Sequence, residues 1–152
     1  MLYIGLAFCI FVIDGLIKYR IEKYGKAGEI LPALHGKIHI HKYHNTGAML
    51  SIGAAKQSMI AMISLLFTVF MSGVFVATLG NKGARTLKVG LALLLGGAYS
   101  NTYDRLKRKY VVDYFSFPVK NNRLRNVIFN ISDFAIMIGA VLYVIGEMLR
   151  SK

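Results

Sequence analysis

Among the aspartates of this chain, Asp113 and Asp133 stand out because neither has an adjacent base. Asp113 lies in YVVDYFSF (110–117), between valines and aromatic residues, where an ionised carboxylate is costly. Asp133 lies within the long apolar segment 127–149. Two carboxylates held together at low dielectric constant do not both ionise easily, so they share a proton. Such a pair can take a proton from water and protonate a carbonyl, which is acid–base chemistry that needs no serine, cysteine or metal.

The other aspartates have bases close by. Asp14 precedes Lys18 by four residues, so the two side chains share one face of a helix. Asp104 is followed directly by Arg105. We therefore interpret Asp14 with Lys18, and Asp104 with Arg105, as local ion pairs. Spacing alone does not establish a catalytic pair elsewhere, and an ion pathway or structural pairing of the two remaining acids is also compatible with the residues.

Other catalytic chemistries find less support in the sequence. Cys9 lies inside an apolar run with no nearby base, and the chain contains neither G-x-S-x-G nor H-E-x-x-H. The segment HGKIHIHKYH is dense enough in histidine to suggest a metal site, but no carboxylate or cysteine is interleaved. We expect a surface cluster or contacts with lipid headgroups, and no metal or cofactor, for His35, His39, His41 and His44.

Long apolar segments must position these residues. The chain has 152 residues, is 55% hydrophobic and only 17% charged, and this composition is typical of a multi-span membrane protein. The net charge of +12 lies in short clusters between the apolar runs, which favours lipid headgroups over nucleic acid as the partner. We therefore expect an all-α membrane protein, a single integral-membrane domain with four transmembrane helices at about 1–17, 58–80, 86–103 and 127–149.

Two excursions, 18–57 and 104–126, connect these spans. KIHIHKYHN alternates apolar and polar residues and so predicts a short strand, within a small β-containing cradle. KYRIEKYGK predicts a short amphipathic segment at the membrane surface. Since consecutive spans alternate in direction, one membrane face receives all four aspartates together with Asn45, Asn101 and Asn130.

Five blocks of the chain resemble, in order, the motifs of bacterial lipoprotein signal peptidases (signal peptidase II). DGLIK is similar to that family's Asp-x-x-x-Lys, NTGAM to Asn-Thr-Gly-Ala-Ala/Ser, and GGAYSNTYDR to Gly-Gly-Ala-x-Gly-Asn-x-x-Asp-Arg. YVVDYFSF resembles Val-Val-Asp-Phe, and FNISDFAIMIG resembles Phe-Asn-x-Ala-Asp-x-x-Ile-x-x-Gly. The chain departs from these motifs where Ser100 replaces glycine and Ser132 replaces alanine, and we expect both serines to retune hydrogen bonding without abolishing activity.

The resemblance implies an aspartic endopeptidase, monomeric and without a cofactor, that acts on prolipoproteins in the lipid bilayer. It implies that the substrate's cysteine carries diacylglycerol and that the cut falls just before this cysteine. It implies that Asp113 and Asp133 are the catalytic pair. It further implies supporting or substrate-binding roles for Asn45, Asn101, Asp104, Arg105, Asn130, Asp14 and Lys18.

The resemblance also implies a bacterial inner-membrane location with the active site on the extracytoplasmic side. Charge counting disagrees, because most of the 19 Lys and Arg residues lie in the two excursions and the positive-inside rule would place those in the cytoplasm. We follow the resemblance, and cysteine labelling from both sides of intact cells distinguishes the two orientations.

Two other functions stay compatible with the residues. The first is a small membrane transporter or proton pathway, in which intramembrane acids carry ions. It would favour polar residues through the full depth of the membrane, which the inner halves of 58–80 and 127–149 lack. The second is a catalytically altered paralogue that binds lipoproteins without cleaving them, although both Asp113 and Asp133 are retained.

Overall fold

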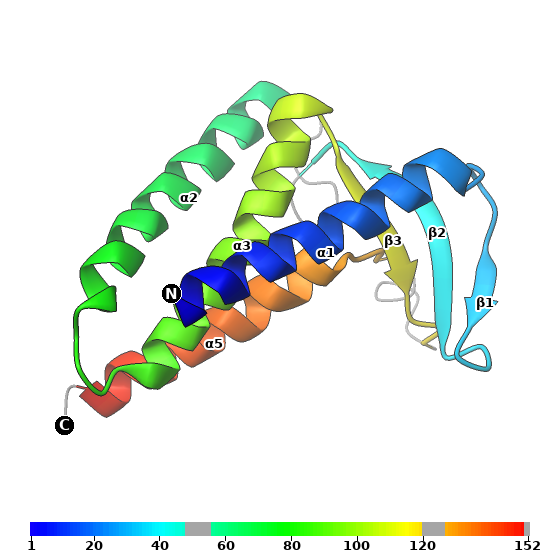
Figure 1. Cartoon of the computed structure of the whole chain (residues 1–152). Coiled ribbons are helices and arrows are strands. Elements are labelled where there is room, and N and C mark those ends of the chain that lie inside the picture. Colours follow the sequence, from blue (N-terminus) through cyan, green and yellow to red (C-terminus); the bar gives the residue numbers. More distant parts are fainter. Residues whose placement is uncertain (48–55, 120–126, 151–152) are drawn as a thin grey trace.

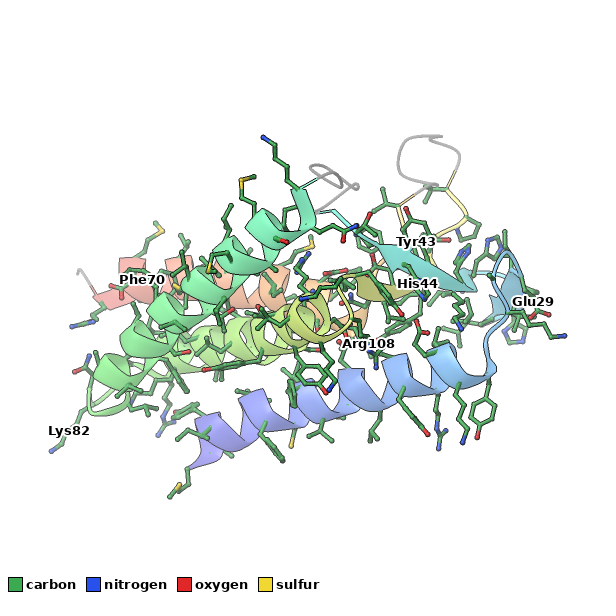
Figure 2. The ribbon with its side chains drawn as sticks, turned by 90° about the horizontal axis from the view of Figure 1, so that it is seen from above. Glu29, Tyr43, His44, Phe70, Lys82 and Arg108 are labelled. Atoms are coloured by element: carbon green, nitrogen blue, oxygen red, sulfur yellow. The ribbon has the colours of Figure 1, made fainter. Side chains whose placement is uncertain are left out.

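Helices form most of the structure, a computed structural model that describes residues 1–47, 56–119 and 127–150. Figure 1 shows the helices side by side, with the sheet at one end of them and both termini at the other. Figure 2 shows the same length from above, with Lys82 at one end and Glu29 at the other. The elements follow the order α1 (Leu2–Tyr24), β1 (Leu31–Ala33), β2 (Ile38–Asn45), α2 (Gln57–Leu79), α3 (Arg85–Lys107), β3 (Val111–Ser116) and α5 (Ile131–Arg150).

Helix α3 is the central helix, and α1, α2 and α5 all pack against it (Figure 1). It packs most extensively on α5, where a Cβ on Gly90 would lie 2.6 Å from the backbone nitrogen of Tyr143. Small residues at such a crossing let two helix backbones approach closely. The apolar core beside this crossing includes Met71, Phe75, Leu87, Leu91 and Leu95.

Three of the described helices, α1, α2 and α5, are long and apolar enough to cross a membrane. Large apolar side chains on their outer faces are exposed, for example Phe8, Phe70 and Val141. Such faces suit contact with lipid. The expected span 86–103 falls in α3, which is not apolar enough on its own because its second half carries polar and charged residues. The neighbouring helices bury most of α3. Its assignment as a fourth membrane-spanning helix stays a prediction.

Two helix boundaries differ from those expected. Helix α1 continues to Tyr24, so most of the predicted amphipathic segment KYRIEKYGK is helical, but it extends the first helix and is not an element of its own. Its helical part, KYRIEKY, holds no glycine or proline, and the helix ends where Gly25 donates its N–H to the carbonyl of Ile21. Helix α5 begins at Ile131 and not near residue 127, because Phe129 pairs with Phe115 of β3 and is extended.

The three strands form an antiparallel sheet in the order β1-β2-β3 (Figure 1). The predicted strand in KIHIHKYHN is confirmed as β2. In the pairing of β2 with β3, Tyr43 lies opposite Asp113 and Asn45 lies opposite Val111. This register, together with the Phe115–Phe129 bridge, brings the end of β2 and the start of α5 to opposite edges of β3. Asp113 therefore lies between two segments that carry other polar side chains.

Candidate active site

Asp113 and Asp133 reach one site from different elements, and Asn130 connects them. The Asn130 side-chain amide donates to Asp113 Oδ1 at 2.7 Å, and its backbone N–H donates to Asp133 Oδ2 at 3.0 Å. In return, Asn130 Oδ1 accepts the backbone N–H of Asp133 at 2.9 Å. This reciprocal pattern is that of a capping box at the start of α5, so local helix capping sets the place of Asp133.

Two further asparagines complete the hydrogen bonding of the carboxylates. Asn45, at the end of β2, donates to Asp113 Oδ2 at 3.0 Å. Asn101 of α3 donates to Asp133 Oδ1 at 2.9 Å, and its Oδ1 accepts hydrogen bonds from Asn130 and, at 2.7 Å, from Lys18 Nζ. Each of the four carboxylate oxygens of Asp113 and Asp133 therefore accepts a hydrogen bond from an N–H of an asparagine. The three asparagines and the two aspartates form one hydrogen-bond network.

Burial dominates the electrostatics of Asp113, which is 2% exposed. Burial, followed by the negative charge of Asp133, raises the pKa of Asp113 from its ordinary value of 3.8 to about 7. The hydrogen bonds from Asn45 and Asn130 and the charge of Lys18 lower this pKa and offset only part of the rise. Near neutral pH, Asp113 can therefore hold a proton beside a second carboxylate, as a proton-sharing pair requires.

A cavity of about 200 Å³ opens beside the two carboxylates. Arg105 lines it, and the Nε of this side chain is buried without a hydrogen-bond partner among the described residues. A buried donor of this kind is costly unless it is satisfied, so a ligand oxygen would suit the position. The remaining wall is largely apolar and is formed by Val111, Val127, Ile128, Phe129, Ile136 and Met137.

Asp14 and Lys18 lie behind the site and are more deeply buried than a helix-end pair would be. Their side chains are 0% and 1% exposed, and Lys18 Nζ lies 2.8 Å from Asp14 Oδ2. Lys18 also donates to the side-chain oxygen of Asn101, and the amide of Asn101 donates to Asp133. Asn101 therefore links this buried cation to Asp133.

Asp104 does not pair with Arg105, so that expectation is wrong. Its carboxylate lies 3.1 Å from Lys18 Nζ and 3.4 Å from Nε of Arg108. Adjacent residues on a helix point in different directions, whereas residues four apart share a face. Asp104 also accepts the backbone N–H of Val112 at 3.2 Å, so it fastens the end of α3 to the start of β3.

The histidines on the sheet lie outside this network. His41 is hydrogen-bonded to Ser116 at 2.7 Å, and His44 is hydrogen-bonded to Glu22 at 2.6 Å and stacked on Tyr110. Within the described ranges, no three His, Cys, Asp or Glu side chains are grouped closely enough to hold a metal ion. His41 therefore has a partner on the sheet, and His44 has one on α1.

Residues 6–149 match the model of the family described as signal peptidase (SPase) II. The chain belongs to the signal peptidase II family. The lipoprotein signal peptidase of Trichormus variabilis is 34% identical over 145 residues, which cover 95% of this chain and 88% of that protein. The lipoprotein signal peptidase of a Nostoc species is also 34% identical, over 144 residues that cover 95% of this chain and 87% of that protein.

Solved structures of bacterial membrane enzymes share the fold of this signal peptidase II family member. One, determined at 2.3 Å by the in meso method, has a TM-score of 0.82 at 25% identity and covers 99% of this chain and 89% of its own. Another, determined at 1.9 Å, has a TM-score of 0.78 at 26% identity and covers 94% of this chain and 90% of its own. The sequence comparisons thus show the family, and the fold is shared with bacterial membrane enzymes.

All nine residues predicted for the signal peptidase II site lie in the described part of the chain and gather in one place. Eight are joined by hydrogen bonds or ion pairs, and Arg105 lines the cavity beside them. Ala48 and Met49 of the NTGAM block lie outside the described residues. The structure adds a group that the motifs did not predict as site residues, three hydroxyl side chains that contact Asp14: Ser100, Tyr114 and Ser132.

Proposed function

We propose that this chain is an aspartic endopeptidase that removes the signal peptide from diacylglyceryl-modified prolipoproteins by cutting just before the lipidated cysteine. The observation that carries the proposal is the pair of carboxylates, Asp113 and Asp133, joined through Asn130 beside a cavity. The relatives that are named lipoprotein signal peptidases support the substrate class. The apolar walls of the cavity suit a peptide carbonyl next to apolar groups, as does the Nε of Arg105, which has no hydrogen-bond partner in the part of the chain that the structure describes.

In the proposed reaction, Asp113 holds the shared proton and Asp133 is ionised. Asp133 accepts a proton from water while the water oxygen bonds to the scissile carbonyl carbon, and Asp113 donates its proton to the carbonyl oxygen. The tetrahedral intermediate then loses its amine. Asp133 passes its proton to the leaving nitrogen as the C–N bond breaks, and Asp113 takes a proton back from a hydroxyl of the intermediate. The pair ends with one proton, as it began.

We further propose that α3 crosses the membrane with α1, α2 and α5, so that a monomer forms a four-helix domain in the bacterial inner membrane. Helix α3 has 23 residues, as α1 and α2 have, which is about 35 Å of helix. Four of its polar residues are buried and hydrogen-bonded within the protein: Ser100, Asn101, Thr102 and Asp104. The substrate's acyl chains would stay in lipid while its peptide reaches the site from the side. We place the site on the extracytoplasmic face, with both termini on the other.

The purified protein is expected to cleave a prolipoprotein that carries diacylglycerol on its cysteine, and to leave the same prolipoprotein without the lipid uncut. The lipid supplies binding energy from outside the reacting bond, which positions the peptide at the carboxylates. Mass spectrometry of the products identifies the cut, which should fall before the modified cysteine. Failure to cleave the lipidated substrate, under conditions in which another signal peptidase II cleaves it, would contradict the proposal.

The rate of this cleavage is expected to fall as the pH rises above about 7, because the pKa of Asp113 is raised to about 7. Above that pH, Asp113 loses the proton that it donates, so kcat/KM should fall by about tenfold per pH unit. Below it, Asp113 keeps its proton and activity persists until the second carboxylate is also protonated. Initial rates across this range, with a Tm measured at each pH to identify unfolding, provide the test. An unchanged rate well into the alkaline range would rule out Asp113 as the acid.

A further inference from the structure

Asp14 accepts hydrogen bonds from three hydroxyl groups that come from three different elements. Ser100 of α3 donates to Asp14 Oδ2 at 2.6 Å, and Ser132 of α5 donates to the same oxygen at 2.5 Å. Tyr114 of β3 donates to Asp14 Oδ1 at 2.8 Å. All four residues are buried, with 0% exposure for Asp14 and Ser132, 3% for Ser100 and 4% for Tyr114. One carboxylate of α1 therefore holds α3, β3 and α5 together.

Each hydroxyl residue is the chain neighbour of a residue in the proposed site. Ser132 precedes Asp133, and Tyr114 follows Asp113. Ser100 precedes Asn101, which donates to Asp133. Since backbone neighbours move together, a hydrogen bond on one neighbour restrains the position of the other. The three bonds thus act on the backbone beside both carboxylates and beside the amide that orients one of them.

Tyr114 has a second contact that strengthens this link. Its hydroxyl oxygen accepts a hydrogen bond, 3.0 Å long, from the backbone N–H of Ile131. Ile131 is the first residue of α5. The bond from β3 therefore restrains the start of the helix on which Asp133 lies. Burial raises the pKa of Tyr114, so its hydroxyl keeps its proton and remains a donor to Asp14.

The three hydroxyl residues also stand at positions where the signal peptidase II motifs that this chain resembles have an apolar residue or glycine. Ser100 stands at the glycine before the asparagine, Ser132 at the alanine before the aspartate, and Tyr114 at the phenylalanine of Val-Val-Asp-Phe. Removing the hydroxyl therefore restores the residue of the motif at Tyr114 and Ser132, and at Ser100 it leaves alanine where the motif has glycine. The coincidence of three added hydroxyls on one acceptor indicates a set that works together.

We propose that Ser100, Tyr114 and Ser132 are positioning residues that hold the catalytic carboxylates in register through their shared hydrogen bonds to Asp14. This proposal rests on the proposed function, because it assumes that Asp113 and Asp133 carry out the cleavage. None of the three lines the cavity beside the carboxylates. They set the distance and relative orientation of two carboxylates that come from separate elements. Small displacements of catalytic groups lower the reaction rate strongly.

The test is a set of variants that remove only the hydroxyls: Ser100→Ala, Tyr114→Phe and Ser132→Ala, singly and together. The triple variant is expected to lose about 100-fold in kcat, with KM for the diacylglyceryl prolipoprotein within about twofold of wild type. Each single variant should lose several-fold in kcat. Measurements at two temperatures well below each variant's own Tm separate misplacement, which persists at both, from partial unfolding, which does not.

Two matched controls remove buried hydroxyls that neither contact Asp14 nor lie next to a residue of the proposed site. Thr78→Ala acts on α2, where Thr78 donates to the backbone carbonyl of Val74, and Ser116→Ala acts on β3, where Ser116 is hydrogen-bonded to His41. Both should keep kcat within about twofold of wild type. If these controls lose as much kcat as the hydroxyl variants, the effect is one of general packing and the inference is wrong.

The other outcomes also decide the matter. Wild-type kcat in the triple variant, or in all three single variants if the triple variant does not fold, overturns the inference and leaves the proposed function intact provided that Asp113→Asn is inactive. A rise in KM with unchanged kcat overturns it as well, because the hydroxyls would then act on binding. Full activity in Asp113→Asn would instead overturn the proposed function on which the inference rests.

Discussion

Asp113→Asn and Asp133→Asn are each expected to reduce prolipoprotein cleavage by about 10³-fold or more. Asparagine has nearly the shape of aspartate but neither accepts nor releases a proton at physiological pH, so the pair can no longer activate water. The substitution also turns one oxygen into an N–H donor that faces another donor, because the oxygens of Asp113 already accept from Asn45 and Asn130. Cleavage rates measured with the diacylglyceryl prolipoprotein provide the comparison.

Stability distinguishes loss of chemistry from loss of fold in this experiment. The pKa of Asp113 is raised to about 7, so at neutral pH and above its ionised form destabilises the folded state relative to an unfolded chain. Asp113→Asn removes this electrostatic cost but places an amide donor against a donor, so the two effects oppose each other and Tm at neutral pH should change little while cleavage is abolished. Glu147→Gln is the matched control, because Glu147 lies at the far end of α5, is half-buried and is 3.8 Å from Arg150. Substantial cleavage by Asp113→Asn would remove it from the proposed pair.

Lys18→Met is expected to have the largest effect on stability, a loss of about 3–5 kcal/mol. Lys18 is 1% exposed and is the shared cation of two buried carboxylates, Asp14 at 2.8 Å and Asp104 at 3.1 Å. Methionine fills a similar volume but leaves both carboxylates buried without this counter-ion. Cleavage should fall as well, since Asn101 loses the shorter of the two hydrogen bonds that hold its side-chain oxygen. Thermal unfolding in detergent, together with the cleavage rate, measures both effects.

A second substitution and a surface control test the cause of this loss. Adding Asp104→Asn to Lys18→Met removes one of the two carboxylates that have lost Lys18 as counter-ion and should recover part of the lost Tm. Lys23→Met, on the same helix, should change stability by no more than about 0.5 kcal/mol, because Lys23 is exposed and contacts only the rings of Tyr19 and Tyr24. If Lys18→Met were as mild as Lys23→Met, the buried cation would not support the site.

Local patterns explain what could be predicted of the fold. The apolar runs that form α1, α2 and α5 are long enough to be recognised without knowledge of their partners. The alternation in KIHIHKYHN predicts β2 for the same reason, since a strand's period of two depends on one segment alone. The capping of α5 by Asn130 was not predicted, so the start of that helix was placed too early.

Contacts between distant segments explain what could not be predicted. Asp104 was assigned to its sequence neighbour Arg105, yet Lys18 and Arg108 are its partners. The separation of 86 residues between Asp104 and Lys18 leaves no periodic signal, and only the packing of α1 on α3 brings them together. The hydroxyls of Ser100, Tyr114 and Ser132 are likewise separated from Asp14 along the chain.

The sequence by itself determined that the chain has long membrane-spanning helices, that its motifs follow the order of the signal peptidase II family, and that Asp113 and Asp133 lack an adjacent base. These properties depend on residue type and short-range spacing. Only the tertiary structure decided that Asn130 joins the two carboxylates, that Lys18 serves two buried acids, and that three hydroxyls meet at Asp14. The register of β3 and the crossing of α1, α3 and α5 place those groups within hydrogen-bond distance.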